Sequence, residues 1–155
     1  MKAYIVCVLS LALSLPLIHA QQQQQAKSDG YWWNEKDDSF KIGFVSGYVL
    51  AMVNVSDVKW FECLAERNGG KVPEVYPGKE AANACGETPD VKRFKFGGYR
   101  NGQWRDGVDE FYKDYRNRGL AIPQAMWYVK QQLEGTPAKQ LEDEVTEWRR
   151  TAVGK

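Results

Sequence analysis

The side chains best suited to chemistry in this chain are four carboxylates within one short segment. They lie between Gln103 and Arg118, at Asp106, Asp109, Glu110 and Asp114. A pair of carboxylates, one of them kept protonated by burial, is what a glycoside hydrolase uses. The spacing favours a simpler interpretation, because Asp109 precedes Lys113 by four residues and Asp114 precedes Arg118 by four. Such pairs stabilise the surface of a helix. A carboxylate-based cell-wall hydrolase is therefore the alternative, and no catalytic residue is predicted.

The end of the same segment indicates protein binding. Arginine and tyrosine are the residue types that anchor protein interfaces, and the run from Asp114 to Gly119 contains both. Arginines at a helix end also offset the negative end of the macrodipole, which is the structural explanation of the same residues. Asp109 lies at the edge of the polar face, where a buried ionic contact is expected. The predicted binding residues are Asp109, Tyr115, Arg116, Arg118 and, on the next helix, Trp127.

The absence of histidine from the exported chain excludes several kinds of site. The only histidine, His19, falls in a predicted signal peptide over residues 1–20, with Lys2 at its start, an apolar run and Ala20 at the cleavage site. Without histidine, a Ser–His or Cys–His nucleophile and a His-ligated metal centre are both excluded. We expect a non-enzymatic protein without metal or cofactor, without a retained membrane anchor, and located in the periplasm or secreted.

Two of the three cysteines stay after cleavage, Cys63 and Cys85. An even number in an oxidising compartment predicts a disulfide. Such a bridge is worth about 3 kcal/mol on the chain-entropy model. It would fasten the glycine- and proline-rich segment 68–102 to the end of the preceding helix. A metal-binding or catalytic thiol pair is the alternative.

Charge excludes another class of partner. The full chain has 21 basic and 20 acidic residues, and cleavage removes Lys2, so 20 of each stay. A net charge of zero gives no electrostatic basis for binding nucleic acid or an anionic membrane.

The element expected to position these groups is the uncharged stretch Ile42–Val53. Its large apolar residues point in nearly every direction on a helical wheel, which is typical of a buried helix. At this length it favours a core helix over a membrane span. Gly43, Gly47 and Ala51 form a narrow stripe of small residues that would let a second helix approach.

Three amphipathic helices follow, over Gln103–Arg118, Pro123–Glu134 and from Thr136 to about Ala152. A short helix is expected at Lys79–Ala84, and Val91–Phe96 could form a short extended piece. Trp127 lies off the apolar row of its helix, so it either packs on a second neighbour or forms an exposed aromatic patch. We predict an all-α, single-domain bundle of four to five helices around one buried helix, with one disulfide. The helical domain covers 31–155, after a disordered Gln-rich lead-in at 21–30.

Two stretches resemble the small periplasmic immunity proteins that neutralise peptidoglycan-amidase toxins of type VI secretion. They are GFVSGYVLAMV and, later, GQWRDGVDEFYKDYRNRGLAIPQAMWYVKQQLEG. The matching positions are mainly core positions: Gly43, Gly47, Gln103, Val108, Tyr112, Ala125 and Val129. No motif for toxin contact matches, and the cysteines are placed differently. The resemblance implies a protein partner in the cell envelope. A carrier of a small apolar ligand, with a cavity lined by residues such as Met52, Phe111 and Met126, is a further alternative.

Overall fold

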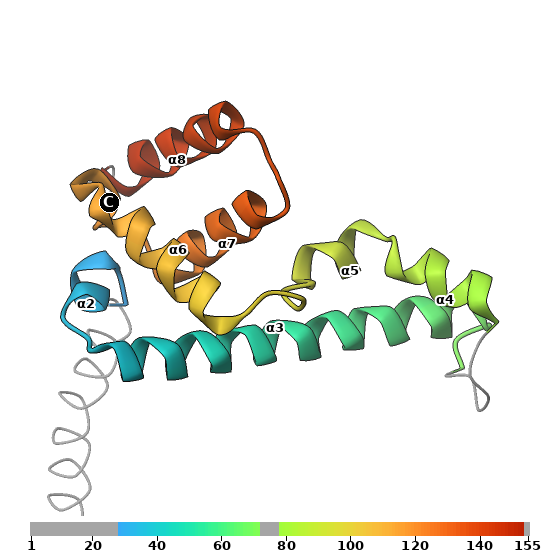
Figure 1. Cartoon of the computed structure of the whole chain (residues 1–155). Coiled ribbons are helices and arrows are strands. Elements are labelled where there is room, and N and C mark those ends of the chain that lie inside the picture. The colour runs from blue at the N-terminus through green and yellow to red at the C-terminus, as the bar shows by residue number, and fades with distance from the viewer. Residues whose placement is uncertain (1–27, 72–77, 154–155) are drawn as a thin grey trace, which may run out of the picture. The chain divides into compact units, whose positions relative to one another are not determined.

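The computed structural model describes residues 28–71 and 78–153, and these ranges are helical with no strand (Figure 1). The elements are α2 (Gly30–Asn34), α3 (Asp38–Arg67), α4 (Lys79–Gly86), α5 (Pro89–Phe94), α6 (Asn101–Lys113), the 3₁₀ helix η1 (Tyr115–Asn117), α7 (Ile122–Leu133) and α8 (Ala138–Val153). The predicted all-α class is confirmed. The predicted signal peptide, residues 1–20, and most of the predicted lead-in lie outside the described residues.

The described helices pack as two compact units, where the sequence predicts one helical domain. The first unit contains α2, η1, α7, α8 and the part of α6 from Asp106 onward. The second contains α3, α4, α5 and the start of α6, up to Arg105. The division follows the apolar surface, because the amphipathic helices bury their rows against one another while α3 packs with α4 and α5.

The first unit has the core that the sequence predicts for its amphipathic helices. Most of its buried apolar side chains come from α6, α7 and α8, the three helices predicted to be amphipathic: Val108, Phe111, Tyr112, Ile122, Met126, Val129, Leu141 and Val145. The phenol of Tyr112 donates a hydrogen bond to the carbonyl of Leu120 at 2.9 Å. Gly107 lets α6 and α7 approach closely, because a Cβ there would lie 2.6 Å from Cγ1 of Val129.

The start of the described chain belongs to this core. Asp29 caps α2 by accepting hydrogen bonds from the backbone N–H groups of Tyr31 and Trp32. Trp33 is fully buried. Gly30 fits where no side chain could, since a Cβ would lie 2.2 Å from Cδ1 of Tyr112. Residues 28–30, the last of the predicted lead-in, therefore contact this core.

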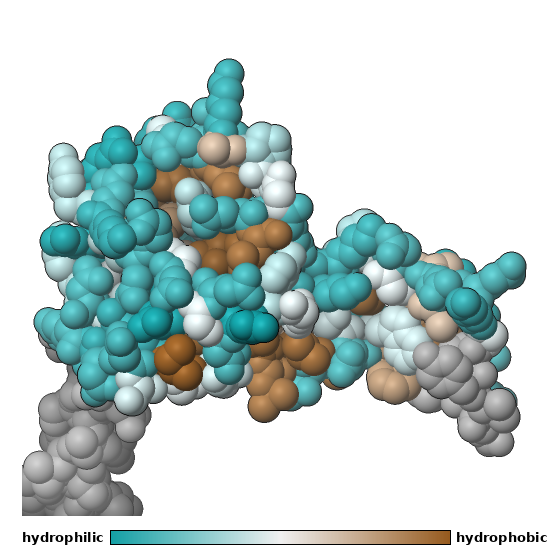
Figure 2. Space-filling view, in the orientation of Figure 1, coloured by the Kyte–Doolittle hydropathy of each residue, from teal (hydrophilic) through white to brown (hydrophobic). Residues whose placement is uncertain are grey.

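The prediction that the stretch Ile42–Val53 is buried on all sides is wrong. Its helix, α3, runs unbroken for 30 residues, and its buried residues are Val45, Ser56 and Leu64. Leu50 is 62% exposed, and Figure 2 shows apolar surface gathered along the middle of α3. The physical reason is a shortage of partners: α4 and α5 have 8 and 6 residues and lie along one side of the helix.

By length and composition, α3 is also apolar enough to cross a membrane, and 11% of its most apolar 18-residue window is buried.

Two other expectations about elements change. Val91–Phe96, predicted as a short extended piece, belongs mostly to α5, which begins with Pro89 in its first turn. The helix predicted over Gln103–Arg118 ends at Lys113, because Asp114 adopts an extended backbone and caps η1 through its side chain. The short helix predicted at Lys79–Ala84 is present as α4.

The predicted disulfide is confirmed. Cys63 near the end of α3 is bonded to Cys85 in α4, with the two Cα atoms 5.8 Å apart. Cys85 is fully buried. The bridge holds α4 against the last turns of α3.

Candidate functional site

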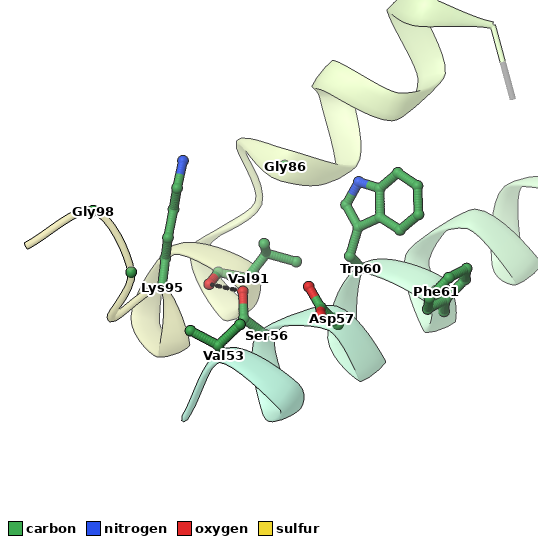
Figure 3. Close-up of a pocket in the computed structure, with 10 residues that line it drawn as sticks. Val53, Ser56, Asp57, Trp60, Phe61, Gly86, Val91, Lys95 and Gly98 are labelled. Atoms are coloured by element: carbon green, nitrogen blue, oxygen red, sulfur yellow. Dashed lines mark hydrogen bonds between the residues drawn. The ribbon is translucent and has the colours of Figure 1, made fainter. Parts of the chain in front are cut away.

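The second unit has an open groove of about 700 Å³ between α3 and the segment that contains α4 and α5 (Figure 3). This volume lies within the range of sites that hold a small molecule or a few side chains of a protein partner. The groove is lined by Val53, Ser56, Asp57, Trp60, Phe61, Gly86, Val91, Lys95, Gly97 and Gly98.

One wall of the groove is a single face of α3. Val53, Ser56, Asp57 and Trp60 follow one another at intervals of three, one and three residues, so they share one side of the helix. At the floor, the hydroxyl of Ser56 donates a buried hydrogen bond of 3.2 Å to the carbonyl of Val91 in α5 (Figure 3). This bond fixes the distance between the two helices at the bottom of the groove.

The aromatic end of this wall is held in place from two sides. The indole N–H of Trp60 donates to the carbonyl of Ala82 in α4 at 3.0 Å. The ring of Phe61 meets the Trp60 ring edge-on, with 5.1 Å between centroids. The Cys63–Cys85 bridge lies within three residues of Trp60 along α3, so the indole is a fixed apolar surface.

The opposite wall comes from α5 and the glycines that follow it. Val91 is 5% exposed, and Lys95 stands along the open side of the groove (Figure 3). Gly98 has a φ of +97°, a left-handed conformation that favours glycine. Between them Phe96 is buried, packed on Tyr48 and Trp104 at centroid distances of 5.7 and 5.2 Å. Phe96 therefore anchors the loop that closes this end.

The groove offers apolar contact with one charge of each sign. Asp57 lies on the α3 wall and Lys95 on the α5 side. Among the lining residues that the structure describes, Asp57 is the only carboxylate, one fewer than glycoside hydrolysis needs. Among the described residues, no group of three or more His, Cys, Asp or Glu side chains is placed to hold a metal ion. The arrangement is suited to binding an apolar group.

Two of the binding residues predicted from the sequence take part in packing within the first unit. Asp109 accepts a 2.7 Å hydrogen bond from the indole N–H of Trp33. Trp127 donates from its indole N–H to Glu144 of α8 at 3.1 Å, and the Lys130 ammonium lies 5.2 Å from the centroid of its ring. Trp127 was expected either to pack on a second neighbour or to form an exposed aromatic patch, and the structure shows the first.

Asp114 is the centre of a cluster of charged hydrogen bonds in the first unit. It accepts from the guanidinium groups of Arg116, at 2.6 Å, and of Arg149, at 3.0 Å. The hydrogen bonds from Arg116 are the main cause that lowers the pKa of Asp114 to about 2. A general acid needs a raised pKa, so this shift has the wrong direction for one. The predicted Asp114–Arg118 helix pair is wrong, because the helix ends before Arg118.

The remaining predicted residues are near each other in sequence but differ in environment. Tyr115 is 73% exposed, Arg116 is exposed and bound to Asp114, and Arg118 is half-buried. Of the other carboxylates, Glu110 pairs with Lys113 and Asp106 is exposed. The structure thus joins Arg116 with Asp114, while Asp109 and Trp127 hold helices together.

The residues of the groove were not among those predicted from the sequence. One signal was available, because Val53, Ser56, Asp57 and Trp60 already share a helical face in the sequence. The contribution of Val91, Lys95 and Gly98 had no such signal, since the segment was expected to be irregular. Comparison of the chain with protein-family models, with curated proteins and with solved structures gives no match.

Proposed function

We propose that this chain is an exported, non-catalytic protein that binds another protein in the cell envelope through the groove between α3 and α5. The observation that carries the proposal is the open groove of about 700 Å³, with Trp60 and Val91 inside it and Asp57 and Lys95 at its edges. The occupant is a segment of the partner that places one large apolar side chain between Trp60 and Val91. A basic group of that segment would face Asp57 and an acidic group would face Lys95.

Two features favour a protein segment over a small ligand. The groove is open along one side, whereas small-molecule sites enclose most of the ligand surface. Phe61, 50% exposed, extends the apolar surface beyond the groove, and fixed aromatic side chains are typical anchors of protein interfaces. Opposite charges at the edges would set the orientation of a bound chain and speed its association.

The test is site-specific photo-cross-linking from the groove. The mature, oxidised protein carries a photoreactive phenylalanine analogue in place of Lys95, and the matched control carries it in place of Lys139, exposed on α8. Each is irradiated in an envelope extract, and cross-linked proteins are identified by mass spectrometry. The proposal expects a protein that is cross-linked from position 95 and not from position 139.

Binding of the identified protein is then measured with purified components. Val53→Glu would place an unpaired charge in the interface, and Lys95→Glu would reverse an edge charge. We expect Kd to rise about 100-fold for the first and about tenfold for the second, with Lys139→Glu unchanged. Circular dichroism checks that each variant is folded. Equal affinity of all three variants for the partner would end the proposal.

The family resemblance supports a more specific partner, a peptidoglycan amidase delivered as a toxin. If this is so, the purified protein inhibits such an amidase on isolated peptidoglycan, and Val53→Glu relieves the inhibition. Inhibition that survives Val53→Glu would place the contact elsewhere, and lack of inhibition at stoichiometric excess would remove this class of partner.

The groove volume also favours a second function, carriage of a small apolar ligand, although its walls differ from those expected around Met52, Phe111 and Met126. The discriminating measurement is binding of a fluorescent apolar probe such as anilinonaphthalene sulfonate. A saturable, stoichiometric site that Val53→Glu abolishes, with no cross-linked protein, would favour the carrier.

A further inference from the structure

The face of α3 turned away from the groove floor has a concentration of exposed apolar side chains. Of the six large hydrophobic residues that are exposed in the described chain, four lie on this helix: Phe40, Leu50, Val58 and Phe61. Their spacing, with Asn54 between them, places them on one side of the helix. A face of this kind on a protein in water marks an interaction surface.

Small residues occupy the same face at one end. Gly43, Gly47 and Ala51 are exposed, and a Cβ added at either glycine would meet no atom within 4 Å. The face is thus asymmetric along its length. The half before Asn54 has hollows at the glycines besides the projecting Phe40 and Leu50, and the half after it has only the projecting Val58 and Phe61.

We propose that this face binds a second copy of the chain, with the two α3 helices antiparallel and the two-fold axis at Asn54. In this register Phe61 of each copy lies over Gly47 of the other, and Leu50 meets Val58. Each of these three projecting residues is matched to a hollow or to another apolar side chain, as an isologous interface requires. Phe40 would oppose Asn68, beyond the end of α3, and lies outside the paired length. A parallel pair would place Phe61 against Phe61 and leave the glycines facing an empty gap.

Asn54 explains why one register would be chosen. It lies at the centre of the face and is exposed. Buried in an interface, its amide needs hydrogen-bond partners, and at the two-fold axis the two amides supply them to each other. A single asparagine of this kind fixes register in paired helices at some cost in stability.

The area fits a weak, reversible dimer. The three large side chains inside the paired length, Leu50, Val58 and Phe61, are between 50% and 62% exposed. At roughly 100 Å² of apolar surface each, two copies bring about 600 Å² together before the glycine backbone and Ala51 are counted. This is below the ~1,000 Å² of a stable specific interface and within the range of weak, transient ones.

A lipid bilayer is the competing occupant, because α3 is long and apolar enough to span one. Polar groups favour the second copy. Asn54 and Asp57 lie in the middle of the helix, where hydrocarbon would leave them without partners. The segment that packs along α3 also has exposed cations, Lys92 and Arg93 in α5, which a bilayer core would reject.

Cysteine cross-linking tests the interface and its register together. The experiment uses the mature, oxidised protein, from which Cys7 is removed with the predicted signal peptide. Because Cys63 and Cys85 are bonded to each other, an added cysteine is then the one free thiol. Asn54→Cys is expected to form a covalent dimer under mild oxidation, while Gly47→Cys alone is not. A mixture of Gly47→Cys and Phe61→Cys chains should give the mixed dimer. Efficient self-cross-linking of Gly47→Cys would show a parallel pair and overturn the proposed register.

Sedimentation velocity of the uncross-linked protein measures the association itself. The wild type is expected to be a dimer, and Leu50→Glu should raise the dimer Kd by about 100-fold or more. Lys139→Glu on α8 is the control that keeps the dimer. A wild type that stays monomeric up to high concentration overturns the proposal. Flotation of that monomer with vesicles of phosphatidylethanolamine and phosphatidylglycerol, abolished by Leu50→Glu, would assign the face to lipid.

Discussion

The two units of this protein use apolar residues in opposite ways. In the first, helices of modest length each have an apolar row, and the rows meet to bury Val108, Met126 and Val145 almost completely. In the second, the most apolar helix of the described chain has three buried residues among thirty. Composition sets how much apolar surface a helix has, whereas the number and length of its partners decide how much of that surface is removed from water.

The space around glycine residues also differs between the two units. Gly30 and Gly107 in the first unit sit where an added Cβ would lie within 3 Å of another residue. Gly43 and Gly47 in the second have open space at the same distance. The same residue type thus permits tight packing inside one unit and leaves a hollow on the surface of the other.

The largest expected effect on stability comes from removing a fully buried aromatic side chain of the first unit. Trp33→Ala should lower the free energy of unfolding by about 3–5 kcal/mol, since it leaves a cavity and removes the hydrogen bond to Asp109. Trp60→Ala, at a half-buried position in the second unit, should cost less. Urea unfolding followed by circular dichroism measures both. A larger loss for Trp60→Ala would contradict the contrast between the units.

The next effect concerns the covalent bond of the second unit. The double change Cys63→Ser and Cys85→Ser should lower the free energy of unfolding by about 3 kcal/mol. The reason is that no covalent bond between residues 22 positions apart then restrains the unfolded chain. Reduction of the wild type should reproduce this loss. Native-state hydrogen exchange should show it in α3 and α4, with the amides of α7 unchanged. Equal loss of protection in α7 would mean that the units unfold as one.

A smaller effect on stability is expected at two glycines of α6, with opposite sign at each. Gly107→Ala should destabilise the protein by about 1–3 kcal/mol, because the new methyl group would overlap Val129. Gly102→Ala, where a Cβ meets no atom within 4 Å, should stabilise by up to about 1 kcal/mol through helix propensity. Thermal unfolding of both variants checks the signs. If both variants changed the melting temperature in the same direction, the space around the added methyl group would not be the deciding factor.

The smallest effect is electrostatic and depends on pH. The pKa of Asp114 is lowered from 3.8 to about 2, so its contribution is fully present above about pH 4 and is lost as pH falls through 2. Asp114→Asn should cost about 1 kcal/mol at pH 7, a modest value because the carboxylate is 28% exposed and partly screened by solvent. The difference in the free energy of unfolding between wild type and variant should decrease from pH 4 to pH 2. A constant difference over that range would show that the negative charge of Asp114 does not contribute to stability.

Local patterns were sufficient to predict much of the fold. The apolar faces of α7 and α8 follow from helical spacing, and the Cys63–Cys85 pair follows from counting the cysteines outside the predicted signal peptide. The end of α6 was missed because Asp114 accepts a hydrogen bond from the backbone N–H of Arg116 with its own side chain and so caps the next turn. Whether Asp114 caps a new turn or continues the helix depends on a few atoms, so it cannot be predicted from the spacing of apolar residues.

The candidate site was harder to predict than the helices. The face with Val53, Asp57 and Trp60 could be read from spacing, but its partner could not, because α5 is a six-residue helix in a segment dominated by glycine and proline. Burial of α3 was overestimated for a related reason. A run of apolar residues says that a helix gains from being covered, and it does not say which segment, or which molecule, covers it.

The position of the disulfide has a practical consequence for handling the protein. Residues 63 to 85 form a covalent ring that includes the last turn of α3 and most of α4. A protease that cuts one peptide bond inside this ring produces a nick, not two fragments. The nicked chain would keep its gel mobility without reductant, gain the mass of one water molecule, and fall apart into two peptides once thiol is added.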